Sequence, residues 1–229
     1  MFRNERGKRK ILKETFIAKE GLKLIIPSFV LSLVLFFSRF SILTTILAVI
    51  ILIFCLFCIY FFRNPKRNTQ RNNENLISPA DGVVTEIGNM TETEFINNEC
   101  TRISIFMSPL DVHVNRAPCE GRISRIVHRS GEFALAFKKD IDKENERNNV
   151  LIEHNNEKIL VVQIAGFLAR RIITYIKENN PVRQGDPIGM IAFGSRVDVY
   201  FPKTYEPVVQ LQGKVKAGLT VLARKKGQL

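Results

Sequence analysis

The uncharged run from Ile42 to Phe62 (ILTTILAVIILIFCLFCIYFF) constrains this chain more than any other feature. As an α-helix rising about 1.5 Å per residue it would reach roughly 31 Å, which matches the hydrocarbon core of a bilayer. A second apolar run, 24–37 (LIIPSFVLSLVLFF), precedes it and carries Pro27 in its first turn, where proline is tolerated. The sequence therefore predicts a helical membrane hairpin over residues 24–62.

Basic residues flank both sides of this hairpin. The chain has 34 Lys plus Arg against 22 Asp plus Glu, a net charge of +12. Much of the excess lies in residues 1–23 and in a cluster at Arg63, Lys66, Arg67 and Arg71. By the positive-inside tendency both flanks belong in the cytoplasm, so the cell membrane is the expected location, with the folded domain on its cytoplasmic side. Anionic lipid headgroups, and not nucleic acid, are the expected partners.

The short first run leaves a second arrangement open, in which the hairpin enters one leaflet without spanning the bilayer. Either way the chain divides into a basic N-terminus (1–23), the hairpin (24–37 and 42–62), a basic linker (63–75) and a folded domain (76–229). Cys55 and Cys58 form a C-x-x-C inside an apolar run, so no redox role is expected for them.

Residues 76–229 are typical of a mainly β domain. Short runs rich in β-branched residues are separated by Gly, Pro, Asn and Asp. The alternation over 196–201 (RVDVYF) predicts a strand with one buried face. A compact β-sandwich or barrel-like domain with few short helices is expected. The helical candidates are Phe133–Asp140 and Phe167–Lys177, of which the second is equally compatible with a strand.

Six motifs follow one another after the apolar runs. They are Phe61–Lys66 (FFRNPK), Ser78–Gly82 (SPADG), Ser108–Pro118 (SPLDVHVNRAP), Glu144–Asn148 (ENERN), Gln163–Arg171 (QIAGFLARR) and Phe193–Arg196 (FGSR). In this order, the set resembles the short bacterial and archaeal branch of the phosphatidylserine decarboxylase proenzymes. The resemblance covers nearly the whole chain after Phe61.

The resemblance implies self-cleavage between Gly194 and Ser195. Ser195 Oγ would attack the Gly194 carbonyl, the resulting ester would eliminate, and the new N-terminus would hydrolyse to a pyruvoyl group and ammonia. Glycine suits the acyl side because it lacks a Cβ. The cofactor is then a pyruvoyl group derived from Ser195, with no external cofactor and no metal. A large chain (1–194) and a small chain (195–229) would stay associated as a heterodimer, and a higher oligomer is left open.

The same resemblance implies decarboxylation of phosphatidylserine in the membrane to phosphatidylethanolamine. The pyruvoyl carbonyl would take the substrate amine as a Schiff base and act as an electron sink for the departing carboxylate. His113 is the candidate for protonating the product, because its ordinary pKa near 6.5 suits proton transfer in either direction. His128 and His154 lie outside the motifs and are interpreted as structural.

The resemblance further suggests that Asp81 helps to activate the serine, either directly or by orienting a histidine. Longer family members carry a second histidine where this chain has Arg116, which cannot act as a base at neutral pH. Which residue deprotonates Ser195 therefore stays open: His113 could serve both reactions, or Asp81 could act alone.

Planar guanidinium groups bind phosphate and carboxylate oxygens through paired hydrogen bonds. The candidates for substrate binding are Arg116, Arg147, Arg170 and Arg171, with Arg196 as a further one, and ordinary surface charge is the alternative for each. Two other functions remain open for the chain. It could decarboxylate archaetidylserine or another serine-headed lipid, or it could be a non-enzymatic, membrane-tethered β-barrel module in which the motifs form only turns.

Overall fold

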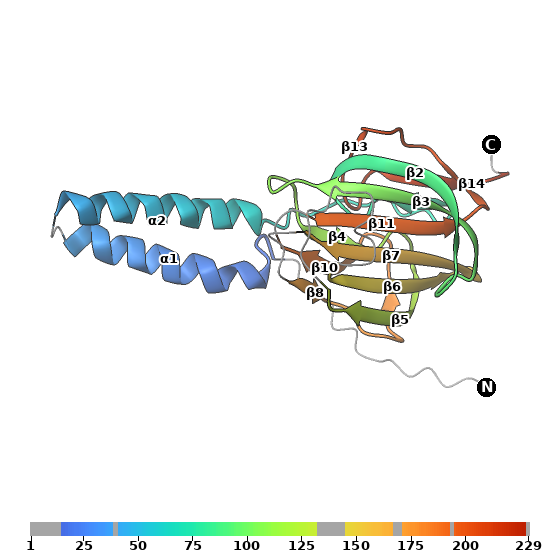
Figure 1. Ribbon diagram of the computed structural model, residues 1–229, viewed down its shortest axis with the longest axis horizontal. Coiled ribbons are helices and arrows are strands. Elements are labelled where there is room, and N and C mark those ends of the chain that lie inside the picture. The colour runs from blue at the N-terminus through green and yellow to red at the C-terminus, as the bar shows by residue number, and fades with distance from the viewer. Residues whose placement is uncertain (1–14, 39–40, 132–144, 167–170, 193–194, 228–229) are drawn as a thin grey trace.

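The computed structural model describes residues 15–38, 41–131, 145–166, 171–192 and 195–227. A helical hairpin projects from one end of a curled β-domain (Figure 1). The hairpin consists of α1 (Lys19–Ser38) and α2 (Ile42–Phe61). The predicted helix at 133–140 lies outside the described residues. Of the second candidate segment, 167–170 also lies outside them, and Ile172–Thr174 forms a strand.

The two helices pack through small side chains. Ser32 donates a hydrogen bond to the Ala48 carbonyl (2.9 Å), and the Cys55 thiol lies 3.6 Å from the Ile25 carbonyl. Close interhelical contacts through small side chains are typical of helix pairs in membranes. Most of the larger apolar side chains of both helices point outward and are exposed. Both helices are long and apolar enough to cross a membrane.

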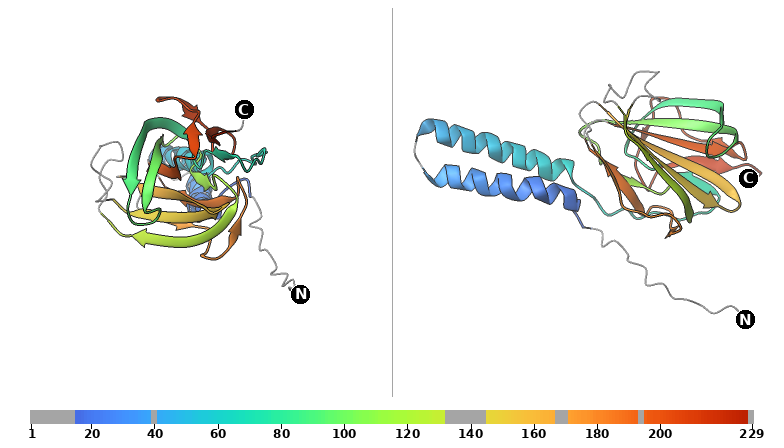
Figure 2. Two further views of the ribbon diagram at one scale, coloured as in Figure 1. Left: turned by 90° about the vertical axis from the view of Figure 1, so that its right-hand side faces the viewer. Right: turned by 60° about the horizontal axis from the view of Figure 1, so that its bottom comes forward.

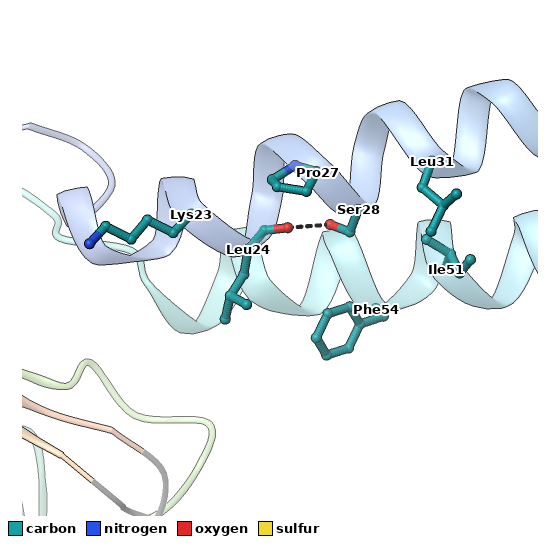
Figure 3. Close-up of a pocket in the computed structure, with 7 residues that line it drawn as sticks. All are labelled: Lys23, Leu24, Pro27, Ser28, Leu31, Ile51 and Phe54. Carbon is teal, nitrogen blue, oxygen red and sulfur yellow. Dashed lines mark hydrogen bonds between the residues drawn. The ribbon is translucent and has the colours of Figure 1, made fainter.

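The first helix begins five residues before the apolar run, so Pro27 lies in its interior and the prediction of a first-turn proline is wrong. The extra turn forms because it packs on the chain that follows α2: a Cβ on Gly21 would lie 2.5 Å from the Phe62 side chain. Beside Pro27 the Ser28 hydroxyl donates to the Leu24 carbonyl (2.6 Å). A shallow apolar groove of about 320 Å³ runs between the helices here, with Lys23 at one end (Figure 3).

In the residues that the structure describes, the β-domain contains three sheets. The largest has the strand order β13-β2-β3-β11-β7-β6-β5-β9, and two three-stranded sheets have the orders β1-β14-β12 and β4-β10-β8. The strands are β1 (Asn75–Ile77), β2 (Gly82–Glu92), β3 (Asn98–Met107), β4 (Val114–Arg116), β5 (Gly121–Arg129), β6 (Arg147–His154), β7 (Glu157–Ala165), β8 (Ile172–Thr174), β9 (Pro181–Val182), β10 (Pro187–Ile191), β11 (Ser195–Pro202), β12 (Tyr205–Pro207), β13 (Lys214–Val215) and β14 (Val221–Lys225).

The large sheet curls around the main core (Figure 2). Ile105 and Val197 on the large sheet pack with Ile188 of β10 and Leu222 of β14, so both small sheets close over the concave face. The predicted mainly β, barrel-like fold with an N-terminal helical hairpin is confirmed. Gly82 opens β2 with φ 155°, where a Cβ would lie 2.1 Å from the Phe106 carbonyl, so no other residue fits this position.

The strand predicted at 196–201 is confirmed as the centre of the large sheet, where β11 pairs with β3 and β7. The prediction that only one of its faces is buried is wrong. Arg196 is 7% exposed and Asp198 is fully buried, and the two form an ion pair of 2.9 Å on the face opposite Val197. The second face of β11 is therefore covered as well. The two buried charges on it are paired with each other, because an unpaired buried ion would be costly.

The base of the hairpin is joined to the β-domain. Phe61 and Phe62 pack with Val114 of β4 and Met190 of β10 in a second apolar cluster. The Ala18 amide donates to the Phe62 carbonyl (2.8 Å). The hairpin is therefore an extension of the β4–β10 end of the domain.

Candidate active site

Ser195 is the first residue of the central strand β11. It pairs with Met107 of β3 on one side and Ala165 of β7 on the other, and it is fully buried. Its hydroxyl lies 3.5 Å from the Met107 Sδ, which is a weak hydrogen-bond acceptor. Gly194, the predicted partner in cleavage, lies outside the described residues. The predicted nucleophile thus sits at the end of the sheet that faces the hairpin.

His113 is fully buried between β3 and β4. Its Nδ1 lies 3.0 Å from the Asp111 carbonyl, which can only accept, so this nitrogen carries the proton and the lone pair is on Nε2. Within the described part of the chain, Nε2 is buried and has no hydrogen-bond partner. The ring packs against Phe61, with 4.2 Å between ring centroids. Burial lowers the pKa of His113 to about 4, so the imidazole is neutral at neutral pH.

The chain brings His113 and Ser195 to the same end of the β-domain. The loop that holds His113 leaves β3 directly after Met107, the residue paired with Ser195. The Ile191 amide donates to the His113 carbonyl (3.4 Å), and Ile191 lies only four residues before the serine. Asn115 contacts the same Met107 Sδ (3.6 Å) that Ser195 contacts.

A chain of buried amides continues from this point. Gln163 donates to Asn115 (2.7 Å) and accepts from Asn148 (2.9 Å). All three side chains are fully buried. Their sequence pattern alone predicted no role for them, although each is a polar residue within one of the six motifs. Gln163 also interrupts an apolar strand, and a polar residue at such a position has to find a buried partner.

Asp81 lies just before β2 and is also buried. Its Oδ2 accepts from Arg67 (2.8 Å) and its Oδ1 accepts from the Ala217 amide (2.7 Å). Among the residues that the structure describes, it makes no hydrogen bond to Ser195 or His113. The carboxylate therefore ties the segment after the hairpin and the C-terminal region to the start of β2.

Arg116 is 2% exposed. It donates to the Gly185 carbonyl (2.9 Å), the Asn64 Oδ1 (3.0 Å) and the Pro65 carbonyl (3.3 Å). These acceptors belong to the protein, and they fix the segment after α2 to the loop before β10.

The other candidate arginines differ in their surroundings. Arg147 begins β6 and is half-buried, and burial together with Arg129 lowers its pKa. Arg171 is exposed, and its carbonyl accepts from the Ala192 amide (3.4 Å). Arg170 lies outside the described residues. Arg196 pairs with Asp198 and points to the face opposite Ser195. Among the described residues, no cluster of His, Cys, Asp and Glu could hold a metal ion.

Comparison with known proteins identifies the family of this chain. The model of the family described as phosphatidylserine decarboxylase matches residues 54–223. A phosphatidylserine decarboxylase proenzyme of Carboxydothermus hydrogenoformans is 44% identical over 170 residues, covering 74% of this chain and 80% of that one. Another, of Pelagibacter ubique, is 41% identical over 213 residues, covering 91% and 96%. A putative archaetidylserine decarboxylase proenzyme of Methanocaldococcus jannaschii is 42% identical over 184 residues, covering 73% and 89%.

The fold and the family match thus define a member of a family of decarboxylase proenzymes that carries two long apolar helices at its N-terminal end. The chain belongs to the phosphatidylserine decarboxylase family, as its motifs indicated.

Proposed function

We propose that this chain is a membrane-anchored proenzyme that cleaves itself at Gly194–Ser195 and then decarboxylates phosphatidylserine to phosphatidylethanolamine. One feature of the molecule carries the proposal. In the part of the chain that the structure describes, the unpartnered Nε2 of His113 is buried at the end of the sheet where Ser195 begins β11. An unsatisfied buried nitrogen is costly, and active sites are where such groups are retained.

Cleavage would convert an internal serine into the catalytic group. Ser195 Oγ bonds to the Gly194 carbonyl carbon while the peptide C–N bond breaks, which leaves an ester. Elimination would then break the Cα–H and Cβ–O bonds of residue 195: the α-proton passes to a base, the carboxylate of Gly194 leaves, and a dehydroalanine remains. Addition of water and loss of ammonia give the pyruvoyl terminus. The buried position of Ser195 supports this route, because the surrounding strands would hold both ends after cleavage.

The pyruvoyl group would supply an electrophilic carbonyl for the substrate amine and a sink for the electrons left by carbon dioxide. Its site is compatible with the residues present, since the neutral His113 offers a lone pair at Nε2 and its Nδ1 is fixed by the Asp111 carbonyl. His113 would hold and return the proton that the product needs at its α-carbon. The buried amides of Asn115 and Gln163 would keep Met107 in place against Ser195.

For Asp81 we propose a positioning role in cleavage. Its contacts with Arg67 and Ala217 would hold the start of β2 in register beside β3, the strand that pairs with β11. Asp81→Asn would then slow self-cleavage while leaving a folded precursor. For phosphate binding the exposed Arg171 and the half-buried Arg147 are the better placed candidates, and Arg170 stays a prediction. Arg116 already has three protein acceptors.

Membrane attachment supports the same function, because the base of the hairpin packs directly on His113 through Phe61. A diacyl substrate held in the bilayer would then meet the site at high local concentration. The two basic flanks favour a cytoplasmic β-domain. The large and small chains would remain together as a heterodimer.

Archaetidylserine is the second candidate substrate, favoured by the name of the Methanocaldococcus jannaschii relative. The chemistry proposed for His113 and Ser195 ends at the serine headgroup and is the same for both lipids.

Decarboxylation by the purified protein, with paired diacyl and ether lipids in mixed micelles, tests the function. We expect carbon dioxide release from the diacyl lipid by the wild-type protein, and none by Ser195→Ala, which should stay a full-length chain. An active Ser195→Ala variant would exclude the proposed site, while preference for the ether lipid would replace the substrate and keep the mechanism.

A further inference from the structure

The loop between β3 and β4 lies at the end of the β-domain next to the hairpin (Figure 1). It forms a tight turn, in which the Ser108 amide donates to Asp111 Oδ2 (2.7 Å) and the Asp111 amide donates to the Ser108 carbonyl (3.0 Å). At its tip the Leu110 side chain is 63% exposed, and three residues further along lies the buried His113. One short loop thus carries an exposed apolar tip and the proposed catalytic histidine.

This loop tip is hydrogen-bonded to the end of α2. The Leu110 carbonyl accepts from Arg63 Nη2 (2.7 Å) and from the Tyr60 hydroxyl (3.2 Å). The Arg63 guanidinium stacks over the Tyr60 ring at 3.9 Å and donates to the Tyr60 carbonyl (2.9 Å). Tyrosine and arginine in this position are typical of the membrane–water interface, where an apolar body meets a polar rim.

A second exposed apolar side chain lies at the same junction. Phe16 is 72% exposed, and its carbonyl accepts from the Asn64 amide (2.7 Å) just after α2. Lys19, Lys23 and Lys66 around the base of the hairpin are exposed as well. Apolar tips among cations at the end of membrane helices match the chemistry of an anionic lipid surface.

We propose that Leu110, together with Phe16 at the same end of the hairpin, enters the boundary between headgroups and acyl chains and holds the entrance of the active site against the membrane. This inference rests on the membrane attachment in the proposed function. Because the hairpin alone could leave the domain at various tilts, a second contact fixes its orientation. The loop would then present a lipid headgroup to His113 without lifting the acyl chains out of the bilayer.

The chain contains no tryptophan, so a single introduced tryptophan reports its own surroundings. Leu110→Trp is the probe and Met90→Trp the control. Met90 is 38% exposed and pairs with Cys100, about 23 Å along β3 from Met107 at a rise of about 3.3 Å per residue. Both variants are reconstituted into vesicles of phosphatidylcholine and phosphatidylserine, with or without acyl chains brominated near the glycerol end.

We expect the Leu110→Trp emission to shift to the blue and to be quenched by the brominated lipid, and the Met90→Trp emission to change in neither respect. Flotation of the vesicles verifies attachment separately. Protein that floats without quenching at position 110 would overturn the inference and leave the membrane attachment intact. A blue shift without quenching would indicate a contact with a second copy and would overturn it too. Protein that does not float would overturn both the inference about Leu110 and the membrane attachment.

Kinetics provide a second readout. Leu110→Ser should raise KM for phosphatidylserine in vesicles by about tenfold, which corresponds to the loss of one buried leucine side chain. Turnover of a short-chain phosphatidylserine dispersed as monomers should not change, and Met90→Ser should change neither value. Equal losses on both substrates would contradict a role in membrane docking.

Discussion

Two buried histidines of the β-domain differ in how many of their ring nitrogens lie within hydrogen-bond distance of a partner. His154 ends β6, with its Nδ1 2.7 Å from the Glu120 carbonyl and its Nε2 3.0 Å from the Asn73 carbonyl. His113, beside the hairpin, uses only Nδ1, and its Nε2 has no partner among the described residues. The region around His154 is built for stability. The region around His113 keeps one basic nitrogen available in an apolar setting, which is what acid–base chemistry needs.

Replacing each histidine by glutamine should separate these regions most strongly. His113→Gln should lower kcat about 100-fold or more, the usual contribution of a general acid or base. His154→Gln should leave kcat unchanged and lower the free energy of unfolding by about 1–3 kcal/mol, because buried carbonyls lose a donor. The measurements are turnover of phosphatidylserine, processing on gels and thermal unfolding. A processed His113→Gln variant with wild-type turnover would contradict the assignment.

The next largest effect is a loss of stability when Arg116 is replaced. Its replacement by methionine should cost about 3 kcal/mol of stability, because three acceptors, two of them buried, lose their charged donor. Arg171→Met, at an exposed position, should leave thermal unfolding unchanged and act, if at all, on KM. An Arg116→Met variant of normal stability but raised KM would mean that Arg116 binds substrate after all.

The pH dependence of stability tests the environment of His113. Its pKa falls from 6.5 to about 4 on folding, so the unfolded chain takes up the proton first. Stability from this residue is complete above pH 6.5 and is lost as the pH falls toward 4. Between pH 6.5 and 5 the wild-type protein should lose about 2 kcal/mol more than His113→Gln. Parallel unfolding curves for the two proteins over this range would refute a depressed pKa.

The smallest effect is expected for Phe61→Leu at the base of the hairpin. The variant should lose about 1 kcal/mol of stability, and the acidic inflection of the pH–rate profile should move up toward 6.5 as water approaches the imidazole. Phe201→Leu, at another fully buried phenylalanine, is the matched control. It should lose similar stability and leave the inflection in place; a shift in both variants would rule out a specific effect of Phe61.

Sequence patterns predicted the features that depend on local composition. The uncharged run identified α2, and the alternation over 196–201 located β11. The motif around His113 placed that residue with Ser195 through a resemblance to a known family. The start of α1 was missed, because its first turn forms through contacts with Phe62 and Tyr175, far along the chain.

Other features depend on contacts that no local pattern contains. The second buried face of β11 lies beside a separate apolar cluster, in which Val162, the partner of Asp198, packs with Phe95. The amide chain through Gln163 joins side chains of β4, β6 and β7. The stacking of Phe61 on His113 depends on how the hairpin docks. The protein acceptors around Arg116 likewise come from distant segments. The local sequence contains only its positive charge, and this charge led to the prediction of a substrate contact.

The intact mass of the small fragment tests the central claim most directly. The purified wild-type protein should yield a fragment of residues 195–229 that is lighter by one ammonia than the serine-headed peptide and that gains two hydrogens on borohydride reduction. Ser195→Ala should give only the full-length mass. An active preparation consisting of a single unbroken chain, or a fragment that begins with an unmodified serine, would contradict the account.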